Sequence, residues 1–114
     1  MDNCIFCKII EGSIPSNKIY EDDTIYAFYD INPAAPVHFL VIPKMHIDSA
    51  NAINSENSAV IAHIFDVIGQ LAAKEGIAEK GYRIVNNCGV DGGQTVEHLH
   101  FHVLGGRNLT WPPG

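Results

Sequence analysis

The chain has 114 residues, of which 46% are hydrophobic, and its formal net charge at pH 7 is −6. This length and apolar content predict one domain spanning residues 1–114. The negative charge argues against a broad nucleic-acid surface, which needs clustered Lys and Arg, but it leaves room for a pocket that binds a small phosphate ligand. No stretch approaches the roughly 20 apolar residues of a membrane span. The N-terminus also lacks the basic start of a signal peptide, so we expect a cytoplasmic protein without a membrane partner.

The first half of the chain predicts a short helix followed by three strands. The helix is expected over residues 4–11, where Asp2 or Asn3 can cap its start. The turn-forming pair Asp22 and Asp23 indicates a hairpin between the first two strands. The three strands are expected at residues 17–21, 24–30 and 37–42.

The second half contains the clearest helical pattern. Apolar residues recur at three- and four-residue spacing between residues 55 and 76, which is typical of a helix with one buried face. After it we expect a strand at 82–86, a glycine-rich loop at 88–94 and a last strand at 96–104. This order predicts an α+β fold with a mostly antiparallel five-stranded sheet, a short N-terminal helix and one long central helix.

The last predicted strand carries three histidines in strict alternation. Because successive side chains of a strand point to opposite faces, His98, His100 and His102 share one face and apolar residues occupy the other. A single histidine on a strand is usually an ordinary core or surface residue, but three in alternation are harder to explain in this way. Ligation of one tetrahedral zinc by all three is disfavoured, since the outer pair is too far apart. The third interpretation is catalytic, because a neutral imidazole is a nucleophile near pH 7 and its neighbours can bind phosphate oxygens.

The loop before these histidines favours the phosphate interpretation. Residues 87–95 read Asn-Cys-Gly-Val-Asp-Gly-Gly-Gln-Thr, and glycines let backbone N–H groups approach a ligand closely. Glycines alone would be equally compatible with an ordinary loop. The phosphate interpretation of this loop therefore depends on the histidines next to it.

The run from Gly92 to Gly106, GGQTVEHLHFHVLGG, resembles the signature of the histidine triad family. The ending Trp111-Pro112-Pro113-Gly114 is similar to the Hint branch of that family, the nucleoside phosphoramidases. The likeness also includes segments at 5–10, 27–31 and 38–43, so it covers nearly the whole chain. It implies the histidine triad fold, a homodimer, and hydrolysis of AMP- or GMP-like purine nucleoside 5'-phosphoramidates through a covalent nucleotidyl-histidine.

The resemblance also implies roles for individual residues. His100, the middle histidine, would attack the α-phosphorus, and His38 would lie behind it and help to hold its tautomer. Thr95 stands where the family has a serine and would supply the proton to a leaving amine, with a stiffer side chain than serine has. The groups that would bind the nonbridging phosphate oxygens are the side chains of His102 and Asn87 and the backbone amides of Gln94 and Thr95.

The rest of the nucleotide is assigned in the same way. Asp30 matches the carboxylate that binds the ribose hydroxyls, although on its own it would be equally compatible with an ordinary turn residue at a strand end. Trp111 is the candidate for a contact across the dimer with the partner's active site. The residues that match the apolar positions around the purine base, and that pattern alone would place in the core, are Ile5, Phe6, Ile9, Phe28 and Ile31.

Cys4 and Cys7 form a Cys-x-x-Cys motif, a spacing that lets two thiolates face one ion. Alone it is ambiguous between zinc binding, redox chemistry and two buried thiols, and three cysteines in an intracellular chain do not predict a disulfide framework. The resemblance adds His46 and His98 as further ligands, because triad proteins with this motif bind zinc through the corresponding histidines. Four protein ligands would fill the coordination sphere, so Zn2+ is predicted to be structural.

Three other functions are compatible with the sequence. One is dinucleoside polyphosphate hydrolysis, as in the Fhit branch, although the ending at residues 111–114 argues against that branch. Another is a nucleotide-binding or scaffold module whose slow turnover is incidental. A metallohydrolase is the weakest alternative, and full activity after zinc removal would dismiss it.

Overall fold

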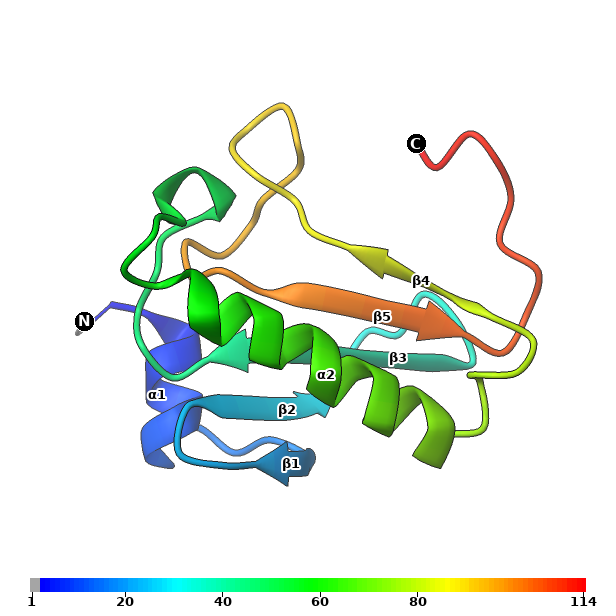
Figure 1. The fold of residues 1–114 in the computed structure, drawn as a ribbon, viewed down its shortest axis with the longest axis horizontal. Helices are drawn as coiled ribbons and strands as arrows, with labels where there is room; N and C mark the ends of the chain where they lie inside the picture. Colours follow the sequence, from blue (N-terminus) through cyan, green and yellow to red (C-terminus); the bar gives the residue numbers. More distant parts are fainter. Residues whose placement is uncertain (1–2) are drawn as a thin grey trace.

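The computed structural model describes residues 3–114, and its centre is a five-stranded sheet with a helix on each face (Figure 1). All neighbouring strands are antiparallel, in the order β1-β2-β3-β5-β4. The predicted α+β fold is therefore confirmed. No helix in this part of the chain is long and apolar enough to cross a membrane. The elements are α1 (Ile5–Glu11), β1 (Lys18–Glu21), β2 (Ile25–Tyr29), β3 (Val37–Pro43), the 3-10 turn η1 (Ala50–Ala52), α2 (Ser58–Lys74), β4 (Tyr82–Val85) and β5 (Phe101–Gly105).

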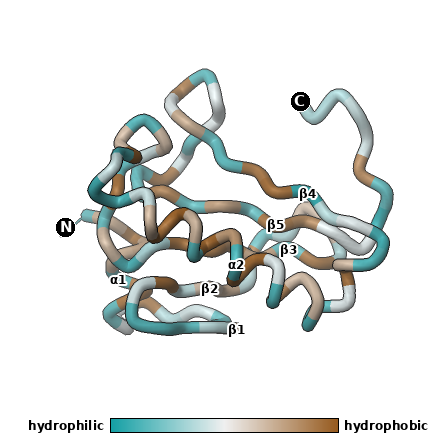
Figure 2. The backbone as a smooth tube through the Cα atoms, in the orientation of Figure 1, coloured by the Kyte–Doolittle hydropathy of each residue, from teal (hydrophilic) through white to brown (hydrophobic). Residues whose placement is uncertain are grey.

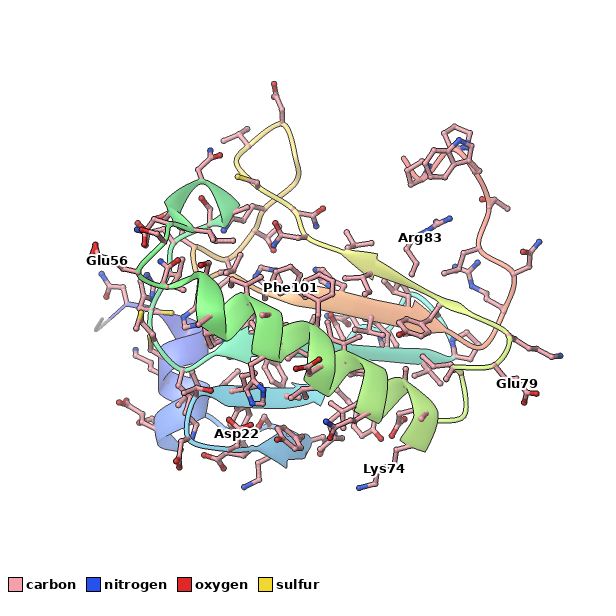
Figure 3. All side chains as sticks on the ribbon, in the orientation of Figure 1. Asp22, Glu56, Lys74, Glu79, Arg83 and Phe101 are labelled. Carbon is pink, nitrogen blue, oxygen red and sulfur yellow. The ribbon has the colours of Figure 1, made fainter. Side chains whose placement is uncertain are left out.

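Helix α2 covers one face of the sheet. Phe39 and Val41 of β3 and Phe101 and Val103 of β5 point to this face and are buried. Figure 3 shows Phe101 between β5 and α2, and Figure 2 shows that apolar residues recur along the strands and this helix. The buried side of this helix consists of Ile64, Val67, Ile68, Leu71 and Ala72.

Helix α1 covers part of the opposite face. Its buried residues Phe6 and Ile9 pack against β2 and β3 in a second, smaller core. A helix of 7 residues is too short to cover the whole sheet. Beyond α1, the same face carries His38, which lies opposite Leu104 in the strand register, and His102, which lies opposite Leu40. The short helix therefore does not cover the part of this face that carries His38 and His102.

The start of α1 differs from the prediction. Its N-cap is Cys4, whose Sγ accepts a hydrogen bond from the backbone N–H of Cys7 at 3.3 Å. Asn3 is not the cap, and Asp2 lies outside the described residues. The N-cap acceptor is therefore a sulfur and not the side-chain oxygen of Ser, Thr, Asp or Asn that is usual at this position.

The last strand is shorter than predicted, because β5 begins only at Phe101. Residues 98–100 do not join the ladder, although β3 extends to Pro43, two residues past the last pair Val41–Phe101; instead the N–H of Leu99 donates to the carbonyl of Ile47 at 2.6 Å. The predicted alternation of faces still holds there. Leu99 lies in the core under α2, whereas His98 and His100 contact Phe6 of α1.

Candidate functional site

His100 is held rigidly and in one tautomer. Its side chain is only 3% exposed, and the ring of Phe6 meets it edge-on at a centroid distance of 5.1 Å. Its Nδ1 lies 2.7 Å from the carbonyl oxygen of His98, which can only accept, so Nδ1 carries the proton. The lone pair of a neutral His100 is therefore on Nε2. The tautomer is fixed by this carbonyl and not by His38, because His38 bonds to a different histidine.

His38 bonds to His102 and fixes the tautomer of that ring. The N–H of Ala34 donates to His38 Nδ1 at 3.0 Å, so the proton of His38 is on Nε2 and is donated to His102 Nδ1 at 2.9 Å. Burial lowers the pKa of both histidines, that of His102 to about 4, so both are neutral at pH 7. Neutral His102 then has an N–H at Nε2, beside His100, whose ring centroid is 5.1 Å from its own.

The depressed pKa of His102 makes the stability of the fold depend on pH. Between about pH 6.5 and 4 the unfolded chain protonates this histidine and the folded chain does not, so its contribution is fully present above pH 6.5 and is lost as pH falls toward 4. We expect zinc-loaded His102→Asn to lose about 1 kcal/mol less stability than wild type between pH 7 and pH 5, after allowing for partial exposure of the ring. Urea unfolding at the two pH values measures this difference. Equal losses in both proteins would contradict it.

Residues 86–95 form a closed loop, called here the glycine loop, that borders the histidines. The backbone N–H of Gln94 donates to the carbonyl of Gly89 at 3.0 Å. At Gly92 a Cβ atom would lie 2.4 Å from the carbonyl oxygen of Cys88, so no other residue fits without a shift. Asn86, which the sequence analysis did not single out, donates from Nδ2 to the carbonyl of His100 at 2.9 Å. The sequence gives only one indication of this role, namely that Asn86 directly precedes Asn87, a predicted phosphate ligand.

The predicted metal ligands come together from three parts of the chain. The structure groups Cys4 and Cys7 of the N-terminal segment with His46 and His98, and their ligand atoms all lie within 4.8 Å of one another. The Nδ1 of His98 is 3.3 Å from Cys4 Sγ and 3.6 Å from Cys7 Sγ, and the Nδ1 of His46 is 3.4 Å from Cys7 Sγ. A tetrahedral Zn2+ would separate neighbouring sulfur and nitrogen ligands by roughly 3.5 Å. This Cys2His2 cluster can therefore bind a metal ion.

The tautomers of the two histidines also fit a metal. His98 Nε2 lies 2.8 Å from the carbonyl of Pro43 and donates to it, so the lone pair of Nδ1 faces the sulfurs. His46 Nε2 lies 2.8 Å from Asp48 Oδ1, which fixes its ring in the same way. Such outer hydrogen bonds orient metal-binding histidines in known sites. Asp48 is a supporting residue that the motif spacing did not reveal.

The comparisons with known proteins agree with this geometry. The family model described as "Scavenger mRNA decapping enzyme C-term binding" matches residues 3–109. The purine nucleoside phosphoramidase of Escherichia coli K12 is 44% identical over 108 residues, which cover 95% of this chain and 91% of that protein. An uncharacterized HIT-like protein of Synechococcus elongatus is 50% identical over 113 residues, covering 99% and 98%. The chain belongs to the histidine triad family.

Solved structures of the histidine triad family share the whole fold. A HIT family hydrolase from Legionella pneumophila has a TM-score of 0.96 and 51% identity, with 98% of this chain and 100% of that chain covered. A histidine triad protein from Clostridium difficile has a TM-score of 0.92 and 52% identity, with 96% and 95% covered. Together with the phosphoramidase, these relatives show that this histidine triad protein is a hydrolase.

The residues that the triad resemblance assigned to the base and the tail lie in two kinds of environment. Phe6, Ile9 and Phe28 are buried in the core beneath α1. Exposed apolar surface is offered by Ile5 and Ile31, which are 46% and 86% exposed. The C-terminal segment extends away from the sheet (Figure 1), and its Trp111 is 81% exposed. Within the chain, this segment is held by Arg83 of β4, which donates to the carbonyl of Thr110 at 2.9 Å (Figure 3).

Proposed function

We propose that this hydrolase cleaves purine nucleoside 5'-phosphoramidates through a covalent nucleotidyl-His100 intermediate. The observation that carries the proposal is the buried His100, whose Nδ1 is bonded to a carbonyl so that Nε2 keeps the lone pair. An imidazole in this tautomer is a nucleophile that needs no separate base. The relative named purine nucleoside phosphoramidase supports the choice of substrate class.

The proposed reaction has two steps. His100 Nε2 attacks the α-phosphorus and forms a phosphorus–nitrogen bond while the bond to the amine breaks. The Thr95 hydroxyl donates its proton to the leaving amine and takes a proton back in the second step. Water then attacks the same phosphorus and breaks its bond to Nε2, while a proton of this water returns to the Thr95 oxygen; the products are the nucleoside monophosphate and free His100. The Nε2–H of His102, the amide of Asn87 and the backbone N–H of Thr95 would bind the nonbridging oxygens, whose charge is best stabilised by fixed donors. The backbone N–H of Gln94, which the resemblance also assigned to phosphate, is already donated to the carbonyl of Gly89 at 3.0 Å.

The remaining parts of the site are proposed by analogy with the family. Ile5 and Ile31, which are exposed, would contact the two sides of the base, whereas Phe6 is buried in the smaller core. Trp111 of a second copy would complete the site in a homodimer. Zn2+ in the Cys2His2 cluster would hold the N-terminal segment to residues 46–48 and to His98, and would leave no coordination position for substrate.

Asp30 is expected to bind the ribose hydroxyls. One of its oxygens accepts the N–H of Asn32 at 2.8 Å, which holds the carboxylate in place, and the other lies 3.5 Å from His38 Nε2. We expect Asp30→Asn to raise KM for an adenosine phosphoramidate about tenfold, as expected for loss of a charge-assisted hydrogen bond. A 2',3'-dideoxy substrate should show no further loss in the variant. If the variant discriminates between the two substrates as wild type does, Asp30 is not the ribose ligand.

Single-turnover mass spectrometry tests the proposed chemistry. Wild-type protein in excess over an adenosine 5'-phosphoramidate is quenched at a series of times, and the added mass of AMP is mapped to a peptide. We expect the adduct to rise and decay on the time scale of product formation, and to lie on His100. Product formed with no adduct at any time would contradict the proposal. Faster cleavage of a dinucleoside polyphosphate would move the substrate to that class, and nucleotide binding without turnover would indicate a binding module.

A further inference from the structure

The side chain of Gln94 does not point to a ligand; it is fully used within the protein. Its Oε1 accepts the backbone N–H of Gly89 at 2.9 Å, and its Nε2 donates to the carbonyls of Asp48 at 2.8 Å and Val96 at 3.0 Å. Two donors and one acceptor on one planar group are what a primary amide provides. Glutamate has no donors at neutral pH, and methionine has neither donors nor a strong acceptor.

One end of this amide closes the glycine loop. Gly89 and Gln94 are joined twice, because the backbone N–H of Gln94 donates to the carbonyl of Gly89 and the side chain of Gln94 accepts the N–H of Gly89. The backbone N–H of Gly93 also donates to the carbonyl of Val90 at 3.0 Å. The backbone conformation of the glycine loop therefore depends on Gln94.

The other end of the amide reaches the segment that carries a metal ligand. Asp48, whose carbonyl accepts from Gln94, also accepts through Oδ1 the Nε2–H of His46. Between them, Ile47 accepts the N–H of Leu99, which lies between the first two triad histidines. Residues 46–48 are thus connected to the Cys2His2 cluster, to the glycine loop and to the triad segment.

We propose that Gln94 is a positioning residue that couples the metal-bound segment 46–48 to the glycine loop. The inference rests on the proposed function only for the statement that this loop binds the phosphate of AMP. When the metal holds His46 in place, the carbonyl of Asp48 is fixed as well. Gln94 bonds to this carbonyl and to the N–H of Gly89, so Gly89 is fixed in turn. Loss of Gln94 and loss of the metal should then loosen the same backbone amides.

Amide hydrogen exchange of full-length protein tests the coupling without any nucleotide. Wild type and Gln94→Met are measured with zinc and after chelation, and the exchange rate of Gly89 is divided by that of a buried β3 amide to correct for global unfolding. In wild type we expect zinc removal to raise this ratio about tenfold. Zinc-loaded Gln94→Met should already show the raised ratio, and zinc removal should change it less than about twofold.

Two outcomes would overturn the proposal: an unchanged ratio in zinc-loaded Gln94→Met, or the same response to zinc removal in both proteins. Gln70→Met, on the exposed side of α2, is the matched control and should behave as wild type. If Gln94→Met fails to fold, Gln94→Glu is used, since it keeps the shape and loses both donors.

AMP binding provides the second readout. We expect zinc-loaded Gln94→Met to bind AMP about tenfold more weakly by calorimetry, with KM raised in proportion and kcat changed less than about threefold, because the loop holds the phosphate and His100 is untouched. A fall in kcat with unchanged AMP affinity would contradict this role. If wild type itself binds no AMP, the proposed function fails, while the exchange experiment still decides the role of Gln94.

Discussion

Replacing His100 with glutamine is expected to lower kcat for an adenosine phosphoramidate by about 10⁴-fold or more, and to abolish the nucleotide adduct. Removal of a nucleophile leaves only binding and oxyanion stabilisation, so losses of this size are usual. Glutamine is close to histidine in volume, which limits the cavity left at a position that is 3% exposed. Steady-state kinetics and intact-mass measurements on the same samples give both results.

His63→Gln is the matched control for this experiment. His63 lies on α2, where its Nε2 is 2.7 Å from Asp22 Oδ2, and α2 covers the face of the sheet opposite the triad. We expect this variant to keep wild-type kcat. Turnover of His100→Gln at the wild-type rate would remove His100 as the nucleophile, even if the variant still bound AMP.

Losing the metal is expected to be the largest single loss of stability. Cys7→Ser removes one of four ligands and should lower the free energy of unfolding by about 3 kcal/mol, which corresponds to a fall in Tm of roughly 10 °C or more. Differential scanning calorimetry with metal analysis measures both the stability and the zinc content. Burial raises the pKa of the free Cys7 thiol to about 11, so zinc must displace a proton and its apparent affinity should rise with pH.

Cys88→Ser tests whether this loss is specific to the cluster. Cys88 lies in the glycine loop and is not among the residues grouped around the metal position. The variant should keep one zinc ion per chain and a Tm within a few degrees of wild type. A Cys7→Ser protein that is as stable as Cys88→Ser would show that the cluster does not support the fold.

Local patterns predicted the elements whose shape depends on neighbouring residues in sequence. The helical spacing gave α2, and β2 and β3 begin and end within two residues of their predicted bounds. Prediction of β5 was less accurate, because the alternation of His98, Leu99 and His100 is compatible with a strand, but these residues do not pair with β3, and Leu99 bonds to Ile47 instead. A pairing partner is a long-range property that one segment cannot reveal.

In the site, too, the residues could be predicted from the sequence but their hydrogen-bond partners could not. The resemblance selected His38 and His100, yet it paired them, whereas His38 bonds to His102 and a backbone carbonyl holds His100. A backbone carbonyl is present at every residue, so the pattern of side chains in the sequence does not show which carbonyl will accept a hydrogen bond. For the same reason the role of the Asp48 carbonyl could be found only in three dimensions.

His98 takes part in two interactions, one through its side chain and one through its backbone carbonyl, and only the first depends on the identity of the residue. Its imidazole belongs to the Cys2His2 cluster, a role that only a ligating side chain can fill. Its carbonyl fixes the proton of His100, and every amino acid has a carbonyl. A substitution of residue 98 would therefore remove a ligand from the cluster but keep the hydrogen bond to the proposed nucleophile His100. The proposed metal site and the proposed catalytic site thus share one residue but use different atoms of it.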